Sequence, residues 1–116
     1  MNRKIGSLGE TVARVFLEKK GYKFVESCWN CRYSEVDLIM KDGCTTVFIE
    51  VKTTSMKSFI QPETHFNKKK IHKLLLAIKI YLAKKPLKDY RLDLIAIRYS
   101  PKVYKVEHYV NVLSVI

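Results

Sequence analysis

A segment with helical periodicity separates two groups of strand-like segments, and this order limits the folds that the chain can adopt. Apolar side chains recur at helical spacing over about residues 67–83, and Pro86 closes the segment. Its buried stripe is expected to consist of Ile71, Leu74, Leu75, Ile78 and Leu82. Strands are expected over residues 22–29, 33–40 and 45–53 before it, and over 90–99 and 102–110 after it. Because a helix between strands permits a parallel crossover, we expect an α/β fold with a mixed five-stranded sheet flanked by helices.

Another helix is expected near the N-terminus. Ser7-Leu-Gly-Glu10 has the pattern of a capping box, which predicts that a helix starts near Ser7. Gly21 is expected to end it. The face toward the core is then expected to carry Leu8, Val12, Val15 and Phe16. A chain of 116 residues fits a single domain over residues 1–116, and residues 55–62 are expected to form a loop.

Positive charge is concentrated in the second half of the chain. Residues 57–105 carry 13 basic and 3 acidic side chains, a net of +10 out of +11 for the whole chain. Such asymmetry favours a polyanionic partner, most often nucleic acid, over a protein that is merely basic. Four of these lysines lie at the start of the central helix, where positive charge opposes the helix dipole but attracts phosphate. We therefore expect Lys68, Lys69, Lys70 and Lys73 to contact a nucleic-acid backbone, the alternative being a solvated helix face.

The sequence predicts a cytoplasmic location without a membrane partner. The longest apolar run, residues 74–83, is interrupted by Lys79 and is too short to span a bilayer. The basic start of the chain is not followed by the apolar core of a signal peptide. Cys28, Cys31 and Cys44 are expected to be ordinary thiols, because Cys28-Trp-Asn-Cys31 lacks the second ligand pair of a zinc site and the helix of a redox motif.

The strands expected at residues 33–40 and 45–53 form a hairpin with a candidate site on one face. Asp42-Gly43 supplies the turn. Because strand side chains alternate, Glu50 and Lys52 share one face, and Asp37 should lie beside them. The other face is expected to be continuously apolar, formed by Val36, Leu38, Met40, Val47, Ile49 and Val51.

Two neighbouring carboxylates repel each other unless a cation lies between them. Mg²⁺ and similar hard ions prefer oxygen ligands, and a nearby ammonium stabilises an anionic transition state. The trio is therefore suited to phosphodiester cleavage. An ordinary cross-strand ion pair on the surface is the alternative.

Motifs along nearly the whole chain resemble the YraN family of small bacterial proteins and, more widely, the PD-(D/E)xK nuclease superfamily. The YraN pattern runs GEIDLI, FVEVK and RFDVV. The matching segments here are Gly9-Glu10, Glu35-Val-Asp37-Leu-Ile, Val47-Phe-Ile-Glu50-Val-Lys52, Lys70-Ile-His-Lys-Leu-Leu, Tyr81-Leu and Arg91-Leu-Asp93-Leu-Ile. Archaeal Holliday-junction resolvases are similar in fold and in the order of the acidic residues. The resemblance implies a restriction-endonuclease-like α/β/α core.

The resemblance also implies roles for individual residues. Asp37 and Glu50 would hold Mg²⁺ or Mn²⁺ together with the main-chain carbonyl of Val51. Lys52 would orient the attacking water or stabilise the phosphorus centre, and Glu10 would complete the acidic cluster through water. Ser34 departs from the pattern, because the family has glycine there, and it alters only the rim of the site.

These observations predict a Mg²⁺- or Mn²⁺-dependent DNA endonuclease, with branched DNA as one candidate substrate. Analogy with resolvases adds a homodimer, since two strands must be cut. A binding module on a nuclease fold that no longer cuts is the first alternative. A basic RNA- or ribosome-associated protein with a purely structural acidic cluster is the second.

Overall fold

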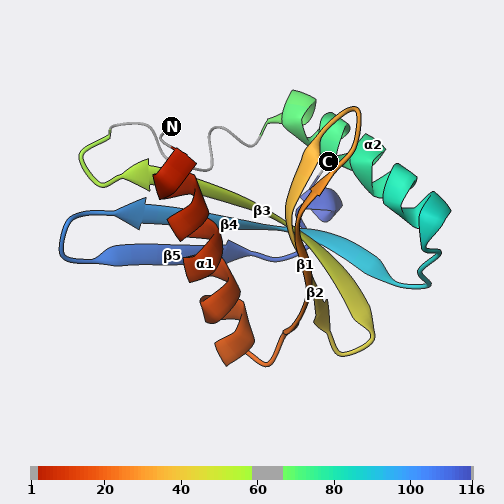
Figure 1. Ribbon diagram of the computed structural model, residues 1–116, viewed down its shortest axis with the longest axis horizontal. Coiled ribbons are helices and arrows are strands. Elements are labelled where there is room, and N and C mark those ends of the chain that lie inside the picture. The colour runs from red at the N-terminus through yellow and green to blue at the C-terminus, as the bar shows by residue number, and fades with distance from the viewer. Residues whose placement is uncertain (1–2, 59–66, 116) are drawn as a thin grey trace.

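The computed structural model describes residues 3–58 and 67–115, which form five strands, two long helices and a short 3-10 helix (Figure 1). In chain order these are α1 Arg3–Lys19, β1 Lys23–Asn30, β2 Glu35–Asp42, β3 Thr45–Ser55, α2 Lys68–Lys84, β4 Tyr90–Tyr99, β5 Tyr104–Tyr109 and η2 Val112–Val115. The strands lie in the order β1-β2-β3-β4-β5. Strands β3 and β4, joined through α2, pair in parallel and the other neighbours pair antiparallel. The expected mixed sheet is confirmed; the loop expected at residues 55–62 lies partly outside the described residues.

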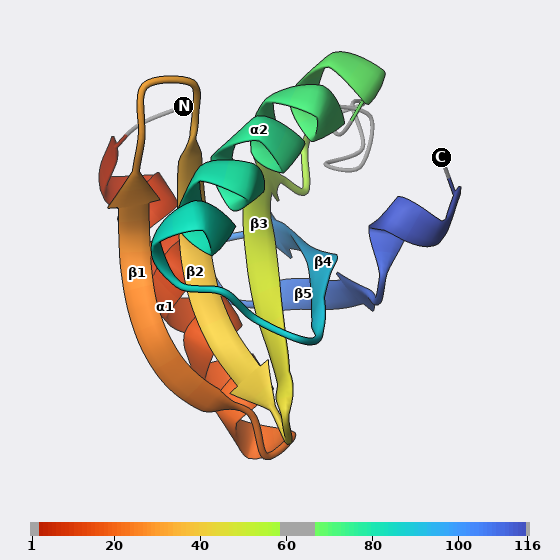
Figure 2. The same ribbon diagram turned by 90° about the vertical axis from the view of Figure 1, so that its right-hand side faces the viewer.

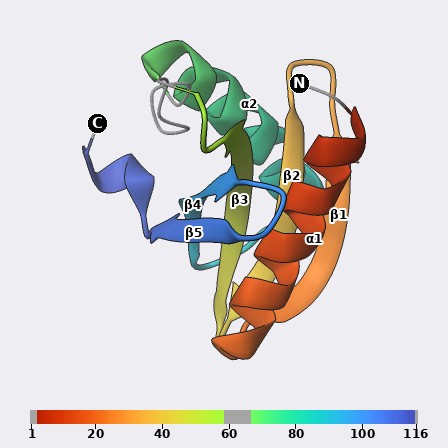
Figure 3. The ribbon, with the colours of Figure 1, turned by 90° about the vertical axis from the view of Figure 1, so that its left-hand side faces the viewer.

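The two helices cover opposite faces of a strongly twisted sheet, as the side views show (Figures 2 and 3). Ala13 and Leu17 of α1 pack with one apolar cluster on the sheet, and α2 packs with a second. The second cluster contains Leu74, Ala77, Ile78 and Tyr81 of α2, with Leu82 only half-buried. The predicted stripe of α2 was therefore right for Ile71, Leu74 and Ile78. It was wrong for Leu75 and Leu82, which are only half-buried, and it missed Ala77 and Tyr81. The α/β/α architecture is the expected one. Among the described residues, no helix is long and apolar enough to cross a membrane.

Helix α1 differs from the prediction in its start and in its buried face. It begins at Arg3, so Ser7 lies inside the helix and does not cap it. Leu8 and Val15 are 58% and 45% exposed, whereas Ala13 and Leu17 are completely buried. The buried face differs because α1 approaches β3 closely: a Cβ atom on Gly9 would overlap with Oγ1 of Thr53. Gly9, Ala13 and Leu17 therefore face the sheet, and the predicted Val12 and Phe16 are half-buried against the same cluster.

Gly9→Ala is expected to lower the free energy of unfolding by about 1 kcal/mol or more, because overpacking against Thr53 exceeds the gain in helix propensity. Urea denaturation measures this loss. Oγ1 of Thr53 is buried and has no hydrogen-bond partner among the described residues, so Thr53→Ala provides room at little cost in hydrogen bonding. In the Thr53→Ala background, Gly9→Ala should become stabilising. A Gly9→Ala variant as stable as wild type would contradict the close approach.

The β2–β3 hairpin is buried on both faces, which corrects the prediction of one apolar and one polar face. Leu38 and Ile49 belong to the cluster under α1, as predicted. Ile39 and Phe48, which by strand alternation share the face of Asp37 and Glu50, are completely buried under α2. Val36 also packs with the α2 cluster and not beside Leu38. The candidate residues Asp37, Glu50 and Lys52 therefore lie at the end of the hairpin that is farthest from its turn.

Candidate functional site

Strand β2 separates from β3 at Asp37, and this separation creates the site. Pairing between the two strands stops at Leu38 and Ile49. The next step of the register would have placed Asp37 opposite Glu50, and the one after it Val36 opposite Val51. Instead, Oδ2 of Asp37 accepts a hydrogen bond of 2.8 Å from the N–H of Val51. Since the N–H and C=O of one strand residue point to the same side, the Val51 carbonyl also faces the side that β2 has left. A carboxylate and a main-chain oxygen are thus brought together.

The carboxyl groups of Asp37 and Glu50 are in hydrogen-bond contact, as the alternation along the hairpin predicted. Glu50 is 5% exposed, so the pair is held largely out of water. The pKa of Asp37 is raised to about 8, mainly by burial and further by the hydrogen bond and the charge of Glu50. The N–H of Val51 and the charge of Lys70 oppose this rise in pKa without cancelling it. Without a bound cation, the carboxyl of Asp37 therefore keeps its proton at neutral pH and can donate it to Glu50.

This raised pKa predicts that stability falls as the pH rises. The unfolded carboxyl titrates near 4, so between that value and about 8 the folded protein binds the extra proton. The free energy of unfolding, measured by urea denaturation in EDTA, should fall across this window. Asp37→Asn should flatten the profile and exceed wild type above about pH 8, because an amide still accepts from Val51 and donates to Glu50. Glu18→Gln, which removes an exposed carboxylate of α1, should leave the slope unchanged; an unchanged slope in Asp37→Asn would contradict the assignment.

Two lysines complete the polar group on the α2 side of the sheet. Nζ of Lys70, in the first turn of α2, lies 3.0 Å from Oε2 of Glu50. Lys52 follows Glu50 by two residues on the same face of β3 and is half-buried. Lys70 was predicted as a phosphate contact, and its ion pair with Glu50 was not foreseen. No local sequence spacing predicts the Lys70–Glu50 ion pair, because it depends on where the crossover between β3 and β4 places α2.

Glu10 lies beside this group without joining it. Its carboxylate accepts a hydrogen bond of 3.3 Å from Sγ of Cys28, a strand residue in the left-handed conformation with φ of 52°. Burial raises the pKa of Glu10, and the charges of Asp37 and Glu35 raise it further, while the hydrogen bond from Cys28 lowers it. The predicted catalytic cluster thus consists of a contacting pair, Asp37 and Glu50, and of Glu10, whose pKa is shifted by the charge of Asp37.

The remaining predicted phosphate contacts lie at the exposed start of α2. Asn67 caps the helix, and its side chain accepts from the N–H of Lys70 at 3.0 Å. Lys68, Lys69 and Lys73 are all exposed. This end of α2 therefore combines exposed side-chain ammonium groups with the positive end of the helix dipole, close to the Asp37–Glu50 pair.

A second buried polar cluster, which was not predicted from the sequence, lies on the α1 side of the sheet. Asp93 of β4 is completely buried and accepts hydrogen bonds from Arg91 at 3.0 Å, from His108 at 2.7 Å and from the N–H of Asn111 at 2.8 Å. Nδ1 of His108 lies 3.1 Å from Nζ of Lys20. An acid inside an otherwise apolar strand was the available signal, because a buried carboxylate requires partners.

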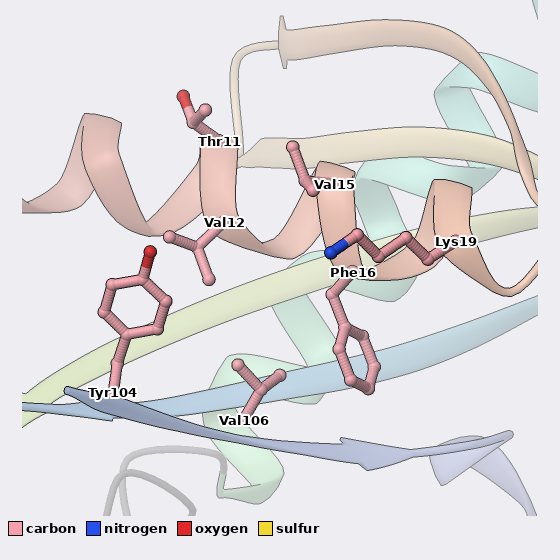
Figure 4. Close-up of a pocket in the computed structure, with 7 residues that line it drawn as sticks. All are labelled: Thr11, Val12, Val15, Phe16, Lys19, Tyr104 and Val106. Atoms are coloured by element: carbon pink, nitrogen blue, oxygen red, sulfur yellow. The ribbon is translucent and has the colours of Figure 1, made fainter.

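Two apolar hollows lie elsewhere, beside α1. One of about 290 Å³ lies between α1 and β5, where Val12 and Phe16 point toward Tyr104 and Val106 (Figure 4). A neighbouring hollow of about 230 Å³ shares Val12 and Tyr104. Neither is lined by a carboxylate, so neither offers groups for acid–base chemistry or for a hard cation. The candidate chemistry lies instead in the Asp37–Glu50 pair.

The donor set at this pair suits a hard divalent cation in type and in charge. The carboxyl groups of Asp37 and Glu50 and one main-chain oxygen are available, and Mg²⁺ commonly takes one or two carboxylates plus water. Within residues 3–58 and 67–115 no group of three or more His, Cys, Asp or Glu side chains is placed to hold a metal. A cation here would therefore depend on the carboxylate pair, the Val51 carbonyl and water.

Comparison with known proteins agrees with the family that the motifs indicated. The model of the uncharacterised protein family UPF0102 matches residues 9–97. A UPF0102 protein of Carboxydothermus hydrogenoformans is 39% identical over 98% of this chain and 99% of its own length. Others from Geobacter metallireducens and Syntrophomonas wolfei are 36% and 35% identical, over 95% and 96% of this chain and 92% and 98% of their own lengths. The chain therefore belongs to UPF0102, the family of the YraN-type proteins.

Proposed function

We propose that this protein is a Mg²⁺- or Mn²⁺-dependent DNA endonuclease of the PD-(D/E)xK type. The observation that carries the proposal is the contact between two largely buried carboxylates, Asp37 and Glu50, where β2 and β3 separate. Two carboxyl groups can be buried in contact only if a proton or a cation compensates their charge. A divalent cation would take the place of the proton that Asp37 otherwise keeps, and this supports a cation site.

The residues around the pair suit hydrolysis of a phosphodiester. A divalent cation bound there would polarise the phosphate and lower the pKa of an attacking water. Asp37 and Glu50 would hold the cation, and Lys52, on the same strand face as Glu50, would stabilise negative charge on the phosphate oxygens. Glu10, whose pKa is raised, would orient water from the α1 side. The resemblance to archaeal Holliday-junction resolvases supports the same assignment.

The distribution of charge supports DNA as the substrate. The net of +10 over residues 57–105 includes the exposed Lys68, Lys69 and Lys73 at the start of α2, beside the pair. Lysine contacts to phosphate supply affinity without sequence information, so a structure-selective substrate such as branched DNA fits better than a defined sequence. A cytoplasmic homodimer, which would bring two such sites to two strands, completes the proposal.

A DNA- or RNA-binding module without cleavage is the second candidate. The observation that favours it is the ion pair between Lys70 and Glu50, because an ammonium already neutralises one of the two carboxylates. Such a module would bind nucleic acid equally well with and without a divalent cation, and Asp37→Ala would leave its binding unchanged.

A cleavage assay separates the two candidates. Linear duplex, single-stranded and four-way-junction DNA are incubated with the wild-type protein in Mg²⁺, Mn²⁺ or EDTA. The nuclease proposal predicts products that require the cation, and the preferred substrate then identifies the structure recognised. Binding to all three DNAs without cutting in either cation would contradict the nuclease and support the binding module.

A further inference from the structure

Lys70 occupies an unusual position for a lysine. It lies in the first turn of α2, where a positive charge opposes the helix dipole, and its Nζ atom is 3.0 Å from Oε2 of Glu50. The side chain of Glu50 is 6% exposed and that of Lys70 is 41% exposed. The carboxylate is therefore fixed in the protein, while the ammonium lies at the end of a flexible stem that reaches in from solvent.

The ion pair uses the same carboxylate that would hold a divalent cation. Glu50 contacts Asp37 as well as Lys70, so a cation between the two carboxylates would lie close to the ammonium. Like charges at such a distance repel strongly where water is largely excluded. Lys70 and a divalent cation therefore compete for Glu50.

We propose that Lys70 exchanges partners, pairing with Glu50 when no divalent cation is bound and with a DNA phosphate when one is. This rests on the proposed function and adds to it a positioning residue that links cation binding to substrate binding. When a divalent cation lies between two ionised carboxylates, their charges cancel and the ammonium of Lys70 is left without a counter-charge. A phosphodiester, which carries one negative charge, restores the balance.

The surroundings of Lys70 favour phosphate as the second partner. The exposed Lys68, Lys69 and Lys73 and the N-terminus of α2 lie around it, so an incoming backbone phosphate meets a positive surface at this point. A lysine ammonium is a compact charge on a rotatable stem, which allows it to change partners without movement of the backbone. The exchange then makes cation and DNA binding mutually reinforcing, because coupling of this kind is reciprocal.

The test compares Lys70→Met with Lys79→Met, two variants that lose one positive charge from the same helix. Lys79 is exposed and follows Lys70 by nine residues, which places it on the opposite side of α2. Mg²⁺ affinity is measured by calorimetry without DNA, above the pKa of Asp37. DNA affinity is measured by fluorescence anisotropy in EDTA and in Ca²⁺, which takes the same oxygen ligands.

Lys70→Met is expected to bind Mg²⁺ about fivefold more tightly than Lys79→Met. The gain in DNA affinity that Ca²⁺ gives to wild type and to Lys79→Met should shrink by a similar factor in Lys70→Met. Equal Mg²⁺ affinities in the two variants, or no Mg²⁺ binding in any form, would overturn the exchange. If wild type cuts DNA and the affinities are equal, the exchange fails and the nuclease stands. If wild type never cuts but Lys70→Met binds Mg²⁺ more tightly and shows the smaller gain in DNA affinity, the nuclease fails and the exchange stands.

Discussion

The Glu50→Gln variant is expected to lose at least about a hundredfold of the rate of metal-dependent DNA cleavage while keeping its fold. Glutamine preserves the volume of the side chain and a hydrogen-bond partner for Asp37. It removes the charge that would hold a cation and that pairs with Lys70. Single-turnover cleavage measures the loss, and thermal unfolding of the same sample verifies that the variant is folded.

The matched control for this experiment is Glu107→Gln, which removes an exposed carboxylate from β5, on the far edge of the sheet from β1. Its cleavage rate should equal that of wild type. Glu50→Gln should still bind DNA in EDTA at least as tightly as wild type, because the phosphate-binding lysines remain and one negative charge is gone. A Glu50→Gln variant that cuts at the wild-type rate would exclude the Asp37–Glu50 pair as the cation site.

The largest loss of stability is expected from Asp93→Ala, which should lower the free energy of unfolding by about 3–5 kcal/mol. The substitution leaves Arg91, His108 and the N–H of Asn111 without their shared acceptor inside the protein. Burial by itself would raise the pKa of Asp93, but the hydrogen bonds from these three groups outweigh it and hold the pKa below its ordinary value. This stabilisation is complete above about pH 4 and is lost as the pH falls through the lowered pKa.

Asp42→Asn is the matched control, because Asp42 binds the same arginine from a position that is 47% exposed. Asp42→Asn should lower the free energy of unfolding by less than about 1 kcal/mol, as for surface ion pairs. Asp93→Asn should also cost stability. Nδ1 of His108 accepts from the Lys20 ammonium, so the proton of the imidazole is on Nε2, which faces Asp93. An amide N–H of asparagine at this position would face another donor. Urea denaturation of the three variants measures these differences. Equal losses for Asp93→Ala and Asp42→Asn would contradict the role given to the cluster.

Periodicity predicted the elements better than it predicted their buried faces. The expected strand over residues 90–99 coincides with β4, and the central helix was placed within a residue at either end. On α1, however, large apolar residues at helical spacing suggested Leu8 and Val15 as core, and both are exposed. The rule that selects large apolar side chains fails where two backbones approach closely, and Gly9 against Thr53 is such a place.

The candidate site was predictable as far as its residues are neighbours in a hairpin. Register and alternation are local properties, so the contact between Asp37 and Glu50 followed from the turn and the period of two. The divergence of β2 at Asp37 and the position of Val36 under α2 did not follow, because they depend on tertiary packing. The same holds for Lys70 on Glu50 and Cys28 on Glu10, which join elements that the sequence pattern does not orient relative to each other.

The most direct test of this account is the anomalous difference density of a crystal soaked in Mn²⁺. We predict one strong peak between Asp37 and Glu50, at about 2.1 Å from an oxygen of each and within reach of the Val51 carbonyl. Lys70 should have moved away from Glu50 in the same crystal. The absence of a peak at this pair under saturating Mn²⁺, with Lys70 still on Glu50, would contradict the assignment of the site as a cation-dependent active site.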